Sequence, residues 1–115
     1  MKTISCPAVL LVLFISSLVS AQGPVHFADA NLKAVVEAKL GISDPTPSDM
    51  LGLTGLAAQS KNIANLTGLD FAANLGDLFL FGNQISDISA LSGLTKLTWL
   101  DLDNNQISDI SALSG

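Results

Sequence analysis

The residues of this 115-residue chain that could do acid, base or nucleophilic chemistry are few. His26 is the only histidine and Cys6 the only cysteine, and the sequence contains no Ser/His/Asp set, glycine-rich phosphate loop or metal-ligand cluster. Asp101 and Asp103 share one face of an expected strand and could be imagined as an acid and a base. A shallow sheet surface lacks the enclosed pocket that raises a carboxyl pKa. We therefore expect no catalysis and no cofactor.

A second group of polar residues recurs once in each repeat of the sequence, at Asn65, Asp87 and Asp109. Two carboxylates one repeat apart could share calcium, but no oxygen-rich loop of calcium-binding spacing surrounds them. Asn65 also begins a glycosylation sequon, Asn-Leu-Thr. Each residue lies where a helical or 3₁₀ turn is expected to begin, and a short polar side chain can cap the first amides of such a turn. We interpret all three as structural caps and expect no metal.

The element that must position these residues is a repeat of 22 residues. The stretch NQISDISALSG occupies 83–93 and again 105–115, and the spacing L-x-x-L-x-L-x-x-N-x-I is present in both copies. Alternation predicts a short strand with inward leucines, and Asn83 and Asn105 are expected to turn the chain and to satisfy backbone groups at the bend. We divide the repeats into 53–74, 75–96 and an incomplete 97–115. Each leucine contributes roughly 1.5 to 3 kcal/mol only when neighbouring coils stack.

The segment before the repeats predicts one amphipathic helix over residues 27–41. Asp29 is a suitable N-cap, Gly41 a suitable end, and the apolar residues lie on one face. A proline-broken link follows, with a short helical turn expected to begin at Ser48 or Asp49. The apolar face of such a helix would cover the open end of the first coil, so residues 22–52 are expected to form a helical cap and linker.

The sequence combines an export signal over 1–21, a cap beginning VHFADANLKAVVEAKLG, and coils containing NQISDISALSGLTKL. Together these features resemble the internalin-type leucine-rich repeat proteins of bacteria. The resemblance implies an α/β repeat solenoid with an N-terminal helical cap, a short parallel β-sheet on the concave face and 3₁₀ or irregular turns on the convex face. It also implies binding of a protein partner against the concave sheet.

Strand alternation sends one set of side chains to that concave face. Aromatic and acidic residues are expected to alternate there across neighbouring strands about 4.8 Å apart. Grouped exposed aromatics are the usual anchors of a protein interface, and the carboxylates favour a basic partner. The alternative is that the rings pack on each other and bind nothing. The expected partner-binding residues are Asp77, Phe79, Phe81, Trp99, Asp101 and Asp103.

The N-terminus and the net charge restrict location and partners. Lys2, the apolar run 8–15 and the small residues ending at Ala21 predict a signal peptide over 1–21, so we expect a secreted or cell-surface protein without membrane insertion after cleavage. Cleavage would remove Cys6 and leave no disulfide or thiolate. Without Lys2, four lysines face ten Asp and Glu residues, and there is no arginine. Nucleic acid is therefore an unsuitable partner.

The sequence stops at Gly115, inside the third repeat and before any polar cap. We expect exposed apolar edges there, and a strand from Trp99 to Leu102 without a partner on its outer side. One alternative is a fragment of a longer leucine-rich repeat protein, once fused to an enzyme or a wall-anchor domain, with no partner of its own. Another is self-association through this uncapped repeat.

Overall fold

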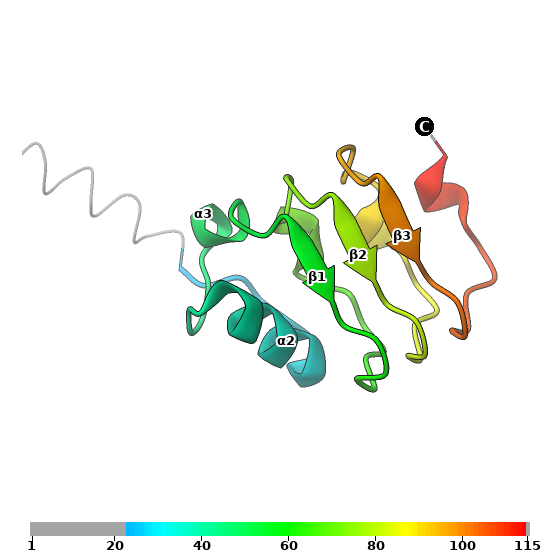
Figure 1. The fold of residues 1–115 in the computed structure, drawn as a ribbon, viewed down its shortest axis with the longest axis horizontal. Helices are drawn as coiled ribbons and strands as arrows, with labels where there is room; N and C mark the ends of the chain where they lie inside the picture. The colour runs from blue at the N-terminus through cyan, green and yellow to red at the C-terminus, as the bar shows by residue number, and fades with distance from the viewer. Residues whose placement is uncertain (1–22, 115) are drawn as a thin grey trace, which may run out of the picture.

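The computed structural model describes residues 23–114, so the expected signal peptide and its cleavage after Ala21 lie outside the described residues. Three parallel strands form one sheet in the order β1-β2-β3, and three 3₁₀ helices stack behind it (Figure 1). Helices α2 and α3 precede the first strand. The fold is the expected α/β solenoid with a helical cap. The elements are α2 (Ala30–Leu40), α3 (Pro47–Met50), β1 (Gly55–Ala57), η1 (Leu69–Phe71), β2 (Asp77–Phe79), η2 (Ser89–Leu91), β3 (Trp99–Asp101) and η3 (Ser111–Leu113).

The register of the sheet follows the 22-residue period. Leu56 lies beside Leu78, and Leu78 beside Leu100, so each inward leucine stacks on its counterpart in the next coil. Leu56 and Leu78 are buried, as predicted. Leu100 and Leu102 also point inward, but they are only partly buried because no further coil covers them in the described residues.

Asn83 joins two coils through its side chain and is only 5% exposed. Its Oδ1 accepts hydrogen bonds from the backbone amides of Lys61 and Ile63, both at 3.0 Å. Its Nδ2 donates to the carbonyls of Ala58 at 2.9 Å and Leu80 at 2.8 Å. Three of these four partners belong to the preceding coil. The asparagine therefore holds its own turn and also fixes the coil before it.

Asn105 repeats this arrangement one coil later. It accepts from the amide of Ile85 at 3.0 Å and donates to the carbonyls of Leu80 and Leu102, both at 2.9 Å. The first coil carries Lys61 at the equivalent position, so it has no asparagine side chain that could bond to the element before it. The cap helix supplies the connection between this coil and the N-terminal segment instead.

Asp29 links the cap helix to the first coil with its two carboxylate oxygens. One oxygen caps α2 by accepting from the amides of Asn31 at 2.9 Å and Leu32 at 3.4 Å. The other accepts from Ala64 at 2.7 Å and Asn65 at 3.1 Å. Partial burial raises the pKa of Asp29, but the four backbone hydrogen bonds outweigh it and leave the pKa below its ordinary value. The predicted N-cap is confirmed, and its bonds to the first coil are an additional role.

The sequence predicted the end of α2 correctly but not the start of α3. Helix α2 ends at Gly41, whose φ of 69° is the left-handed conformation typical of a helix end. The expected start of the second helix at Ser48 or Asp49 is wrong, because α3 begins at Pro47. Thr46 is its N-cap and forms a capping box with Asp49, and proline suits the first helical position because its φ is already helical.

The three residues expected to be caps make different turns. Asp87 and Asp109 each accept a hydrogen bond at 2.9 Å from the amide two residues later, which is the first residue of η2 and of η3. This bond holds the pKa of both carboxyls below the ordinary value. Asn65 accepts from the amide of Thr67 at 2.8 Å, but no 3₁₀ helix begins there, and η1 starts two residues further on.

Candidate binding face

Six side chains define what we call the aromatic face, the side of the sheet opposite the 3₁₀ helices. Asp77 lies beside Trp99 and Phe79 beside Asp101, the neighbours that the repeat period predicts. The ladder continues past the strands, since the amide of Leu80 donates to the carbonyl of Asp101 at 2.8 Å. A further bond of 3.0 Å, from the amide of Gly82 to the carbonyl of Asp103, brings the ends of the two strands together. The six residues of the aromatic face are Asp77, Phe79, Phe81, Trp99, Asp101 and Asp103.

The three rings of this face are exposed to different degrees. Trp99 is 61% exposed and Phe81 40% exposed, while Phe79 is partly buried. The rings of Phe79 and Trp99 lie with their centroids 6.3 Å apart and tilted by 45°, a favourable aromatic geometry. Part of the ring surface is therefore covered by this contact, in line with the alternative that the rings pack on each other. Most of the indole and much of Phe81 stay open to a partner.

Within residues 23–114 the carboxylates of the face form no ion pair, since both ion pairs there are made by Lys33 on α2. Asp101 accepts a hydrogen bond at 3.1 Å from the amide of Asp103, which orients one carboxylate. A shallow groove of about 410 Å³ follows β3 and is lined by residues 98–103. The face is thus acidic and aromatic, without an enclosed cavity.

Sequence reasoning missed a second surface, between α2 and β1. A groove of about 570 Å³ lies there, lined mainly by small apolar side chains with Lys39 and Lys61 among them. The sequence does show an alanine-rich side of the helix, but it does not show that this side faces the edge of β1. In the part of the chain that the structure describes, no cluster of metal-ligating residues occurs, and no helix is long and apolar enough to cross a membrane.

Comparison with known proteins agrees with the repeat geometry. Residues 65–115 match the family model described as leucine-rich repeats in two copies. An internalin (inlF) from Listeria monocytogenes is 40% identical with a TM-score of 0.73, over 76% of this chain and 27% of its own. Internalin C2 (inlC2) from the same species is 30% identical with a TM-score of 0.72, over 84% of this chain and 43% of its own.

A third solved structure, of CBM51-2 and INT domains from Clostridium perfringens ZmpB in complex with GlcNAc, is 32% identical with a TM-score of 0.63. That match covers 69% of this chain and 17% of the other. No curated protein matches the sequence. The repeat spacing, the sheet register and the matched family model define a leucine-rich repeat protein. With its helical cap and its likeness to two internalins, the chain belongs to the internalin type. It spans less than half the length of each of these structures.

Proposed function

We propose that this chain is an exported, non-catalytic binding module that holds a basic segment of another protein on the aromatic face. The observation that carries the proposal is the combination, on one face, of an indole 61% exposed with carboxylates that form no ion pair within residues 23–114. An aromatic anchor supplies contact area, and the surrounding negative charge selects and attracts a basic partner. The predicted signal peptide and the similarity to internalins support export.

The runner-up is a structural unit without a partner of its own. The packing of Phe79 against Trp99 favours it, because rings that stabilise each other need no ligand. It differs from the first proposal in one respect that can be measured. A structural role makes the aromatic rings matter for folding, whereas a binding role makes them matter for affinity.

The experiment uses Trp99, the only tryptophan of the chain, as a fluorescent reporter. The purified protein is titrated with the peptide Arg-Leu-Arg-Leu-Arg-Leu and with its Glu-Leu counterpart. The double substitution Phe79→Ser and Phe81→Ser keeps the reporter. Phe71→Ser is the matched control, because Phe71 is 43% exposed but lies on η1, behind the sheet.

We expect the basic peptide to quench Trp99 and the acidic peptide to leave it unchanged. The double variant should weaken binding at least tenfold, and Phe71→Ser should leave it unchanged. Circular dichroism checks that each variant stays folded. Equal affinity of the double variant and the wild type would contradict the binding proposal and favour the structural unit. The substitution of all three rings, Phe79, Phe81 and Trp99, by serine can then be followed by calorimetry.

A further inference from the structure

The groove between α2 and β1 is a second interaction surface of opposite character. Its helix side consists of residues at positions i, i+3, i+4, i+7 and i+8, which share one face of α2. Its sheet side consists of β1 and the chain just after it. Figure 1 shows α2 lying alongside this outer strand of the sheet. The lining residues are Asn31, Ala34, Val35, Ala38, Lys39, Leu56, Ala57 and Lys61.

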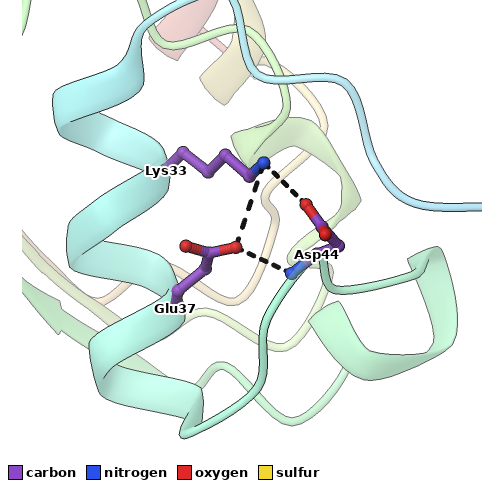
Figure 2. A network of polar contacts seen from close by, with 3 residues as sticks. All are labelled: Lys33, Glu37 and Asp44. Atoms are coloured by element: carbon purple, nitrogen blue, oxygen red, sulfur yellow. Dashed lines mark hydrogen bonds and ion pairs between the residues drawn. The ribbon is translucent and has the colours of Figure 1, made fainter.

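Positive charge gathers at this groove although the protein is acidic. Figure 2 shows how Lys33 is engaged elsewhere, 2.6 Å from Asp44 and 4.0 Å from Glu37. The hydrogen bond to Asp44 raises the pKa of Lys33, so that lysine stays charged and paired. Lys96 donates to the side chain of Asn74 at 2.8 Å. The remaining two lysines of residues 23–114 both line the groove, and neither forms an ion pair within that range.

These two lysines, Lys39 and Lys61, lie near opposite ends of the groove. Asn31 donates to the carbonyl of Asn62 at 3.1 Å, which places Lys61 near the start of α2. Lys39 lies eight residues further along the helix, and a rise of 1.5 Å per residue makes this about 12 Å. In an extended peptide about four residues cover the same distance, at roughly 3.3 Å each. Two acidic side chains four positions apart therefore fit the two lysines.

The edge of β1 offers backbone groups to such a peptide. The carbonyl of Thr54 accepts from Gly76 at 2.8 Å, and the amide of Ala58 donates to Phe79 at 2.8 Å, so the backbone of both residues faces β2. Backbone groups alternate in direction along a strand, which turns those of Gly55 and Ala57 to the outer edge of the sheet. Helix α2 packs along this edge, but within residues 23–114 no hydrogen bond joins it to these two residues. Ala57 also lines the groove, so its backbone groups can bond to a peptide that lies there.

We propose that this groove binds an extended acidic peptide in which two carboxylates flank an apolar residue. The carboxylates pair with Lys39 and Lys61, the apolar side chain packs on the floor formed by Val35 and Leu56, and the peptide backbone bonds to Ala57 of β1. The groove adjoins the aromatic face, because Ala57 pairs with Phe79, but it needs a partner of the opposite charge. Its test substitutes lysines and not the aromatic rings, so its failure and the failure of the proposed function can be told apart.

The test is fluorescence anisotropy with the labelled peptide Glu-Ala-Leu-Ala-Glu, whose two glutamates and leucine share one side of an extended chain. Gln-Ala-Leu-Ala-Gln removes the charge, and Glu-Ala-Ala-Leu-Glu moves the leucine to the other side. The variant carries Lys39→Gln and Lys61→Gln. Its matched control carries Lys33→Gln and Lys96→Gln, which removes the same charge from other surfaces. All lysines concerned are on the surface, and circular dichroism checks the fold.

We expect the first peptide to bind at least tenfold more tightly than the other two. The groove variant should bind the first peptide at least tenfold more weakly than the wild type does. The matched control should change that affinity less than threefold at 0.15 M salt. Reversal of both charges, Lys39→Glu and Lys61→Glu, should transfer the preference to Lys-Ala-Leu-Ala-Lys. Equal losses in the groove variant and the matched control would overturn the proposal, because the effect would then be one of net charge. Equal binding of the three peptides would overturn it too.

Discussion

Replacement of Asn83 by alanine should be among the most damaging polar substitutions in this protein. The side chain is nearly fully buried and makes four hydrogen bonds of 2.8 to 3.0 Å, two as acceptor and two as donor. Alanine leaves two amides and two carbonyls without these bonds. At about 1 kcal/mol net for each bond, the free energy of unfolding should fall by about 4 kcal/mol. That is a large part of the roughly 5 to 15 kcal/mol by which folded domains are stable.

The assay is urea unfolding followed by circular dichroism, with a thermal melt beside it. A loss of about 4 kcal/mol corresponds to a fall in melting temperature of roughly 16 to 32 °C in a domain of this size. Asn105→Ala should cost about half as much, because its surroundings are only partly buried and water can replace the lost bonds. Lys61→Ala, at the equivalent exposed position of the first coil, should change stability by less than about 0.5 kcal/mol.

One result would refute this reasoning about Asn83. If Asn83→Ala and Lys61→Ala lowered the free energy of unfolding by the same amount, the asparagine would not be tying the coils together. Asn83→Asp adds a second check, because it keeps an acceptor for the two amides but cannot donate to the two carbonyls. It should therefore be at least as destabilising as Asn105→Ala at neutral pH, where it also buries a charge.

Two further predictions concern the cap and the core. Asp29→Asn keeps one acceptor but turns a donor toward the amides of the first coil, and it should cost about 1 to 2 kcal/mol at pH 7. Because the folded pKa of Asp29 is lowered, its stabilisation is present above the unfolded value of about 3.9 and is lost as the pH falls through the folded pKa. Urea unfolding should therefore give a smaller difference in unfolding free energy between the wild type and Asp29→Asn at pH 2 than at pH 7. A difference that stays constant would contradict the role of the charge. Leu78→Ala should lower the free energy of unfolding by about 3 kcal/mol and Leu100→Ala by clearly less, since only Leu78 is fully buried. Equal losses in urea unfolding would show that the third coil is packed as tightly as the second.

Local patterns in the sequence were enough for much of the fold. A period of 22 residues fixes which side chains are neighbours in the sheet, so Asp77 beside Trp99 could be predicted by counting. The ends of α2 were equally local, because Asp29 and Gly41 act on amides and carbonyls within a few residues. The capping box of Thr46 with Asp49 is also a local pattern, so the start of α3 at Pro47 could have been read from the sequence.

What the sequence by itself determined is therefore the solenoid, its register and the face that carries the aromatic residues. Only the tertiary structure decided which contacts join the coils. Asn83 reaches amides 20 and 22 residues away, Asp29 reaches amides 35 and 36 residues away, and Lys39 and Lys61 come to one groove. The physical reason is that a repeat pattern gives the order of the coils along the chain. The offset between stacked elements and the rotamers that bridge them are set by packing in three dimensions.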